Sequence, residues 1–454
     1  MAGAADETVM DSALTNDRGR LVGEDVQVSV LSGELRRYVD LDAAATSSAS
    51  VTVARAVQDF LPWYSSVHRG AGAKSRYASA RYEQARESLL PFVGADPGTH
   101  LALFTRNTTE ALNTLAFRLD LRPEDVVLTT AVEHHANLLP WRRYARLRVI
   151  EVDTRGTFTP QDVIAALDQH PTPRVLAISG ASNVTGWLPE LARIAGAAQA
   201  RGVFVVVDAA QLAGHRPIDM TGLGVDALAL SGHKMYAPFG SGALVAPRHL
   251  LARGEPLLVG GGAVKAVSFD DVVWADAPDR DEAGSPNVLG AVALAAAAHE
   301  LTSNGWPGLL AHERSLTQAL DAELATVPGL HRYGPAAGDR LPVATFNLHG
   351  LPHALLAARL AAEHAIGVRS GCFCAHPYMA RLLSLSQEQV QQFHRDAQLD
   401  QRHQLPGAVR ASANRTTSLC DVAALGSALR AIAATPEQGT RYRLDEHGDY
   451  VPRH

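Results

Sequence analysis

The sequence predicts an α/β protein built on an open, mostly parallel β-sheet with helices on both faces. Short, continuous apolar runs alternate with helical patterns between about residue 100 and residue 245. Continuous β-branched and apolar runs are typical of strands buried on both faces of a parallel sheet. Their alternation with helices favours an α/β fold. The expected strands are 101–104, 126–128, 174–179, 203–208 and 227–230.

The segments outside this sheet are expected to form a leader and a second domain. Residues 1–30 start with a polar, acidic stretch, so we expect a disordered leader that lacks the basic and apolar regions of a signal peptide. The large domain is placed at 31–300, with an N-terminal part that can pack against the small domain. An alanine-rich helix over 290–300 precedes the small α/β domain, which is placed at 301–454.

Two segments of the small domain stand out. The run 343–348 is strand-like, whereas the Gln- and Arg-rich stretch 378–408 has apolar residues at helical spacing. The stretch 378–408 is therefore expected to be an inserted helix or lid.

The composition excludes several classes of protein. The chain has 454 residues and a net charge of −6, which disfavours a surface for nucleic acid or anionic membranes. No apolar stretch approaches the ~20 residues that a membrane span needs. With three cysteines in the whole chain, a disulfide scaffold is not expected. We therefore expect a cytoplasmic protein with no nucleic-acid or membrane partner.

Polar side chains follow each of the five expected strands. Asn107 or Thr108 can cap a helix, with Glu110 in the position of a capping box, and the same groups can bind phosphate at the helix N-terminus. His134 and His135 are either metal ligands or ordinary histidines, and no third ligand stands at a metal-like spacing. No metal site is predicted.

The last three strand ends add an amide, a carboxylate and an amine. Asn183 is either a turn residue or a site residue, and Asp208 needs a cationic partner or a role as a helix cap because it ends an apolar run. Lys234 follows the fifth strand. Ligands of open parallel sheets bind outside the carboxyl ends of the strands, so these residues are expected to share one site.

These residue types together indicate pyridoxal 5′-phosphate (PLP) as the cofactor. The amine of Lys234 can form an imine with an aldehyde. Asp208 can keep a pyridine nitrogen protonated, so that the ring accepts electrons, and His134 can stack on the ring. Ser231 and His233 can contact the phosphate and orient the lysine.

Segments between about residue 38 and residue 422 carry a resemblance to a known family. The chain resembles the class V aminotransferases among the fold-type I PLP enzymes, and within them the group II cysteine desulfurases and selenocysteine lyases. The segments are LDAAATSS, VHRG, TRNTTEALN, EHHANLLPW, SNVTG, VDAAQ, SGHKMYAPFGSGAL, GGG, EAGSPN, VRSGCFCAHP and VRAS. This resemblance implies a seven-stranded, mostly parallel sheet in the large domain.

The resemblance also implies a role for each matching residue. Lys234 is the Schiff-base lysine, Asp208 partners the pyridine nitrogen and Gln211 bonds the phenolic oxygen. His134 is implied to stack on the ring and to act in catalysis by helping to protonate intermediates. The residues implied to hold the phosphate are Thr108, Thr109, Ser231, His233 and, across a homodimer with shared active sites, Ser285. Asn183 is implied to contact either the cofactor or the substrate carboxylate. The arginines implied to lie near the substrate are Arg369, Arg410 and, again across the dimer, Arg69, with Arg410 expected to bind the α-carboxylate.

Cys374 matches the desulfurase nucleophile, which takes sulfur from L-cysteine as a persulfide and leaves alanine. The reactive form is the thiolate, which nearby cations favour. Cys372 stands where the family commonly has histidine, and it is either a resolving or relay thiol or a packing residue. The chain departs from the family in having Ala43 in place of an asparagine, in lacking a histidine pair before the cysteine, and in its longer stretch 378–408.

Cysteine desulfuration is therefore the expected function, with L-cysteine or a related sulfur amino acid as substrate and a sulfur-acceptor protein as an expected partner. The alternative is a PLP-dependent C–S lyase or aminotransferase of a biosynthetic pathway, in which Cys374 is not the nucleophile. A non-catalytic binding protein is disfavoured because Lys234, Asp208 and His134 are present together.

Overall fold

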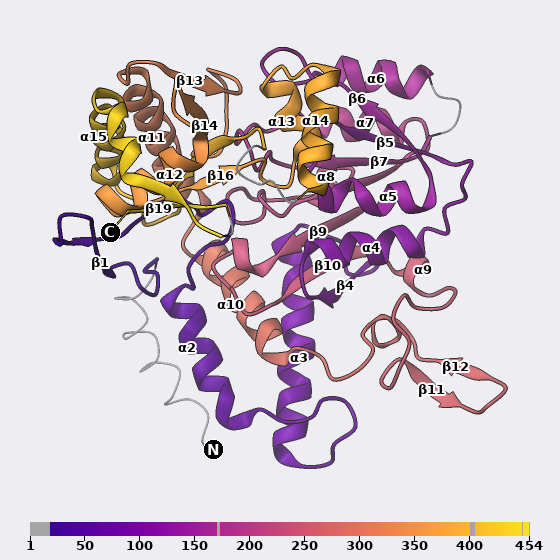
Figure 1. The fold of residues 1–454 in the computed structure, drawn as a ribbon. Coiled ribbons are helices and arrows are strands. Elements are labelled where there is room, and N and C mark those ends of the chain that lie inside the picture. The colour runs from indigo at the N-terminus through magenta and orange to yellow at the C-terminus, as the bar shows by residue number, and fades with distance from the viewer. Residues whose placement is uncertain (1–18, 170–172, 400–404, 447, 454) are drawn as a thin grey trace.

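The computed structural model describes residues 19–169, 173–399, 405–446 and 448–453. A seven-stranded sheet forms the centre of the large domain, in the order β4, β10, β9, β8, β7, β5, β6 (Figure 1). Its strands are β4 His100–Thr105, β5 Val126–Thr130, β6 Arg146–Ile150, β7 Pro173–Ser179, β8 Phe204–Asp208, β9 Ala227–Ser231 and β10 Gly242–Pro247. β10 pairs antiparallel with β4 and β9, and the other pairs are parallel. The expected α/β fold with a mostly parallel sheet is confirmed.

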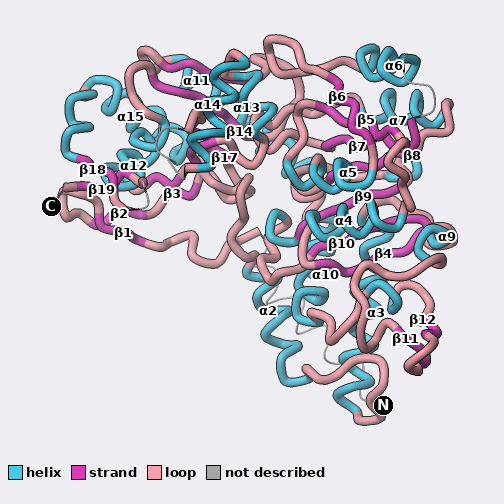
Figure 2. Tube along the Cα trace, turned by 45° about the vertical axis from the view of Figure 1, so that its right-hand side comes forward, coloured by secondary structure: helices cyan, strands magenta, loops and turns pink. Residues whose placement is uncertain are grey.

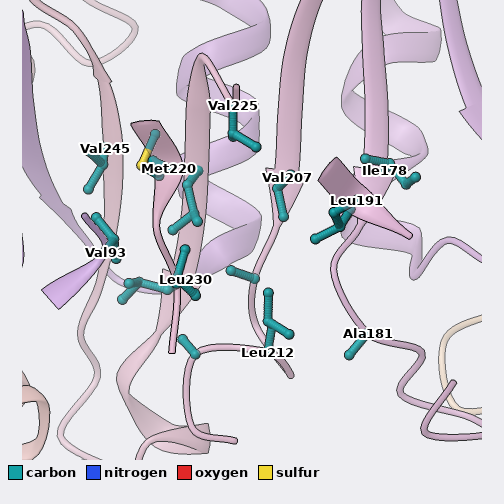
Figure 3. Packing of buried hydrophobic residues seen from close by; sticks show 14 of the residues in the cluster. Val93, Ile178, Ala181, Leu191, Val207, Leu212, Met220, Val225, Leu230 and Val245 are labelled. Atoms are coloured by element: carbon teal, nitrogen blue, oxygen red, sulfur yellow. The ribbon is translucent and has the colours of Figure 1, made fainter. Parts of the chain in front are cut away.

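Alternate residues of the strands face two separate hydrophobic cores, as the period of a strand requires. In β8, Val205 and Val207 belong to one core and Val206 to the other. Figure 3 shows Val207 and Leu230 among the side chains of the first core. Both faces of the sheet are covered, which explains why the strands are continuous apolar runs.

Helices pack on both faces of this sheet. On one face lie α4 Thr108–Arg118, α5 Leu139–Tyr144 and α9 Arg248–Leu251; residues of α6 Pro160–Gln169, α7 Leu191–Gln199, α8 Met220–Leu223 and α10 Val288–Ser303 contribute to the core on the other. α10 extends the expected helix 290–300 at both ends, and Asn287 caps it by accepting a hydrogen bond from the Gly290 N–H at 2.9 Å. The helices α2 Val51–Phe60 and α3 Ala73–Phe92 pack against α10.

A second, smaller α/β unit lies beside the large sheet. Its four strands, in the order β13, β14, β17, β16, are β13 Leu330–Tyr333, β14 Val343–Leu348, β17 Ala408–Ser412 and β16 Arg369–Gly371. Its helices are α11 Trp306–Ala325, α12 His353–His364 and α15 Leu419–Ala434, and a hairpin of β18 Tyr442–Leu444 and β19 Tyr450–Pro452 follows them. The short strand β3 Val39–Asp40 pairs with β15 Ile366–Gly367, so an N-terminal segment packs with this unit.

The expected leader, 1–30, lies only partly within the described residues. Residues 1–18 are outside them, and residues 19–30 depart from the expectation. Within that range Leu21 is 3% exposed, and β1 Gln27–Ser29 pairs with β2 Leu35–Arg37. Burial and strand pairing order this stretch, so a disordered leader does not extend to residue 30.

The stretch 378–408 forms parts of two helices rather than one. These are α13 His376–Leu382 and α14 Gln387–Gln398, and residues 400–404 lie outside the described residues. Figures 1 and 2 place both helices between the small unit and the end of the large sheet that carries β6. The hairpin of β11 Val264–Val267 and β12 Val272–Trp274 projects from the large domain on the side away from α13 and α14 (Figure 1). Within the described ranges, no helix is both long and apolar enough to cross a membrane.

Candidate active site

All but two of the predicted site residues line one cavity of about 450 Å³ at the carboxyl edge of the large sheet. They are Thr108, Thr109, His134, Asn183, Asp208, Gln211, Ser231, His233, Lys234, Arg369, Cys374 and Arg410. Residues that follow the parallel strands meet β16, β17 and the Cys374 loop of the small unit here. The cavity therefore lies where the two units face each other.

The N-terminus of α4 forms one end of the cavity. Asn107 caps the helix by accepting a hydrogen bond from the Glu110 N–H at 3.0 Å, whereas the Glu110 carboxylate accepts from the Arg106 N–H, so the pair is not a reciprocal capping box. The Thr108 N–H donates to Ser231 Oγ at 2.8 Å and joins α4 to the end of β9. The dipole and backbone N–H groups of a helix N-terminus favour an anion, and Thr108 and Thr109 line this end of the cavity, which therefore fits a phosphate.

Lys234 and Asp208 lie at neighbouring strand ends. Lys234 ends the 3-10 turn η3 Gly232–Lys234 between β9 and β10, and Asp208 ends β8. Burial lowers the pKa of Lys234 to about 8, against the opposing effect of Asp208. Burial raises the pKa of Asp208, which is 5% exposed and accepts one hydrogen bond from the Ala210 N–H at 2.9 Å. A buried carboxylate in this position fits a protonated ring nitrogen.

His134 precedes the 3-10 turn η2 His135–Asn137 and caps it, because its Nδ1 accepts from the Ala136 N–H at 3.0 Å. Burial, together with the charge of Lys234, lowers the pKa of His134 to about 3. The ring is therefore neutral at pH 7 with its proton on Nε2, which suits stacking on an aromatic cofactor. In the described part of the chain, no three His, Cys, Asp or Glu side chains are grouped to hold a metal ion.

Asp42 bridges the two arginines of the site. Its carboxylate lies 3.2 Å from Arg410 Nη2 and 3.0 Å from Arg369 Nη2. Arg410 is 2% exposed and donates through Nη1 to the Asn183 carbonyl at 2.9 Å, while its buried Nε has no partner among the described residues. Burial lowers the pKa of Arg410 to about 10, so it stays a cation at pH 7. An unpaired N–H on a buried guanidinium fits a carboxylate ligand.

The Cys374 loop closes the side of the cavity formed by the small unit. Cys374 is exposed, and the neighbouring Phe373 carbonyl accepts from Asn183 Nδ2 at 2.8 Å. Cys372 Sγ–H donates to the Pro406 carbonyl at 2.9 Å, and burial raises the pKa of Cys372 to about 11. Cys372 is therefore a thiol at pH 7, which favours its packing role over a role as a reactive relay.

Gln211 and His233 contact the N-terminal segment as well as the cavity. Gln211 Nε2 donates to the Ala44 carbonyl at 2.6 Å, and His233 Nδ1 lies 3.2 Å from Thr46 Oγ1. Burial lowers the pKa of His233 to about 4, so its ring is neutral at pH 7.

Ser285 and Arg69 lie outside this cavity. They line a second one, of about 500 Å³, together with His68 and Glu282. Ser285 is exposed there, and Arg69 Nη2 donates to the Val264 carbonyl at 3.1 Å. Neither side chain reaches the cavity of its own chain, so their expected role across a dimer stays a prediction.

Several further residues of the cavity were not among the site residues predicted from the sequence. Asn107 and Ser179 line it, and so does Phe373, whose ring centre lies 4.9 Å from the Arg410 guanidinium carbon. The sequence did indicate Asn107 as a helix cap, and Phe373 could have been suspected because it precedes Cys374. Asp42, which binds both arginines of the site, was indicated only as a carboxylate in the segment LDAAATSS.

The chain is similar to known proteins over most of its length. Residues 39–425 match the family described as Aminotransferase class-V. The chain is 37% identical to a probable cysteine desulfurase from Halobacterium salinarum over 75% of its own length and 83% of the relative, and 37% identical to the cysteine desulfurase CsdA from Escherichia coli over 76% and 86%. The apo structure of a cysteine desulfurase from Thermococcus onnurineus NA1 superposes with a TM-score of 0.78 at 31% identity, covering 87% of this chain and 95% of the other.

The fold and the site define an enzyme of the fold-type I PLP class. The protein belongs to the class V aminotransferase family, whose members depend on PLP. The cavity fits this cofactor because it presents an anion site at α4, a buried carboxylate at Asp208 and an amine of lowered pKa at Lys234.

The pKa of Lys234 predicts how cofactor uptake depends on pH. With a pKa of about 8, about a tenth of the amine is neutral at pH 7, far more than for an ordinary lysine. The rate at which PLP binds covalently to the apo protein should rise with pH and level off above about 8. Visible absorbance after rapid mixing measures it, with N-acetyl-lysine as the control for titration of free PLP. A midpoint near that of an ordinary lysine would contradict the prediction.

Proposed function

We propose that the protein is a cysteine desulfurase that takes sulfur from L-cysteine onto Cys374. The observation that carries the proposal is the exposed Cys374 in one cavity with Lys234 and Arg410. The named relatives support it. The reaction converts L-cysteine and the Cys374 thiol into alanine and a persulfide on Cys374, so atoms and electrons balance without another reactant.

The residues of the chain divide the work of this reaction. When bound, PLP supplies an aldehyde for the substrate amine and a ring that accepts electrons as bonds at the substrate carbon break. Asp208 holds the proton on the ring nitrogen, and Arg410 binds the α-carboxylate. Lys234 moves the proton at the substrate Cα. The Cys374 thiolate attacks the substrate sulfur: the S–S bond forms, the C–S bond breaks and its electron pair leaves with the carbon.

Replacement of Cys374 tests the proposal against the alternative of a C–S lyase or aminotransferase. We expect the wild type to release alanine from L-cysteine and, with a thiol reductant, sulfide. Cys374→Ser should lose both products, because a hydroxyl cannot take the sulfur, yet keep the visible absorption of bound PLP. Cys420→Ser is the matched control, since Cys420 is exposed on α15 and outside the cavity. Pyruvate and ammonia that persist in Cys374→Ser would overturn the proposal in favour of a lyase.

We further propose a homodimer in which Ser285 and Arg69 approach the active site of the other subunit. The second cavity supports this, because Ser285 is exposed there and outside its own chain's site. Glu282 holds this region by accepting hydrogen bonds from Arg86 Nη1 at 2.6 Å and from the Phe104 N–H at 2.7 Å.

Mixed dimers test the sharing of sites. Ser285→Glu places a negative charge against the phosphate and Lys234→Ala removes the amine, so each homodimer should be inactive. If Ser285 acts across the interface, a dimer of one chain of each kind regains one complete site and about half the wild-type activity. Inactive mixed dimers would show that Ser285 serves its own chain.

A sulfur-acceptor protein is proposed as the partner that removes the persulfide, and a reducing cytoplasm as the location. Both rest on chemistry: Cys374 is exposed, and all three cysteines are free. A persulfide on an exposed thiol can pass to another thiol by exchange.

A further inference from the structure

Three aromatic rings connect helix α14 to the Cys374 loop. The centres of the His135 and His376 rings lie 4.5 Å apart, edge to face. The ring of Phe393, a residue of α14, lies 5.0 Å from the ring of His376. Phe393 is 6% exposed although most of α14 is exposed. None of the three has a part in the reaction as proposed above.

The backbone of this loop has a conformation that side chains disfavour. Phe373 has a φ of 53° and Cys374 a φ of 52°, so two successive residues other than glycine are left-handed. This region is sparsely populated by L-residues because Cβ approaches a carbonyl oxygen. Such a conformation persists only where the surrounding structure holds it.

His135 holds the loop from two sides. Its backbone N–H donates to the Cys374 carbonyl at 2.8 Å, and its ring Nε2 accepts from the His376 N–H at 3.2 Å. These two hydrogen bonds hold the residues on either side of Ala375. Burial lowers the pKa of His135 to about 4, so at pH 7 the ring is neutral and Nε2 can accept. The ring of His376 packs against the same imidazole.

We propose that α14 braces the catalytic loop: Phe393 packs His376 against His135, and His135 thereby fixes the backbone of Cys374. Phe393 and His376 are positioning residues that act through His135. The inference rests on the proposed role of Cys374 and assigns the stretch 378–408 a function at that site. It predicts that loss of either ring loosens the loop while the cofactor pocket stays intact.

Hydrogen–deuterium exchange of the intact PLP-loaded enzyme tests the brace without relying on activity. In Phe393→Ala and His376→Ala, the peptide covering residues 372–378 should exchange several-fold faster, because the His376 N–H loses its fixed acceptor. A peptide from α15 serves as the reference. PLP absorbance should be unchanged, and kcat for L-cysteine should fall more than KM changes.

Matched variants separate packing from charge and from damage to α14. His376→Phe and Phe393→Tyr keep an aromatic ring, and Gln391→Ala alters an exposed residue of the same helix. All three should exchange like the wild type. Wild-type exchange in both alanine variants would overturn the inference, as would fast exchange in His376→Phe. Because exchange is read without turnover, either result is distinguishable from failure of the proposed desulfurase activity.

Discussion

Lys234→Ala should abolish activity on L-cysteine and remove the covalent attachment of PLP. The only other lysines of the chain are Lys74 and Lys265. Both are exposed, whereas Lys234 lines the cavity. Neither Lys74 nor Lys265 lines the cavity, so neither can replace it. We expect the rate to fall at least about 10⁴-fold, which corresponds to about 5.5 kcal/mol of transition-state free energy.

Borohydride reduction makes the assignment independent of turnover. Reduction fixes PLP to its lysine, and peptide mass mapping should find the label on Lys234 alone. Lys265→Ala is the matched control: Lys265 pairs with Asp276 at 2.6 Å on the exposed β11–β12 hairpin and should leave both label and rate unchanged. Label on Lys74 or Lys265, or wild-type turnover by Lys234→Ala, would remove the basis of the proposed site.

The large sheet was predictable because its strands are buried on both faces. The run 203–208 is nearly all apolar, and β8 occupies it almost unchanged. β6 was not predicted from the apolar pattern because it is an edge strand whose exposed arginines interrupt that pattern. β10 was not predicted because it follows a glycine-rich segment, and its antiparallel direction arises from pairing with β4 and β9.

The position of the cavity was predictable once the sheet was recognised as mostly parallel. Parallel strands bring their carboxyl ends to one edge of the sheet. Asp208 and Lys234 each follow such a strand, so the sequence pattern alone predicts that they lie at the same edge. Asp42 could not be placed in this way. It comes from the N-terminal segment that packs with the small unit, and its bonds to Arg369 and Arg410 join residues more than three hundred positions away. Only the assembled fold brings these charges together.

The Cys374 loop illustrates a second limit of sequence analysis. GCFC indicates a thiol, but a φ above zero at Phe373 and Cys374 contradicts the local preference of both residues. Tertiary contacts from His135 and Asn183 override that preference. An inserted helix or lid was expected over 378–408, whereas the structure has two helices there. α13 begins at His376, within the segment VRSGCFCAHP, and α14 begins after a capping box on Ser386.

Asp208→Asn should reduce activity by on the order of 10²–10³-fold, the range for removing one group that stabilises developing charge. An amide cannot keep the ring nitrogen protonated, so the ring accepts electrons poorly. The substitution also removes the carboxylate that raises the pKa of Lys234, so the midpoint of PLP uptake should fall below about 8. Both effects follow from a single charge.

Asp226→Asn is the matched control. Asp226 is a half-buried carboxylate that accepts a hydrogen bond from the Val205 N–H at 2.7 Å. It lies at the amino ends of β8 and β9, whereas Asp208 lies at the carboxyl end of β8. Asp226→Asn should leave the uptake midpoint and the rate close to those of the wild type. If the uptake midpoint of Asp208→Asn instead moves upward, Asp208 does not act on Lys234 as a negative charge. If its rate of turnover equals that of the wild type, Asp208 does not hold the proton on the ring nitrogen. Another group must then keep the cofactor ring able to accept electrons.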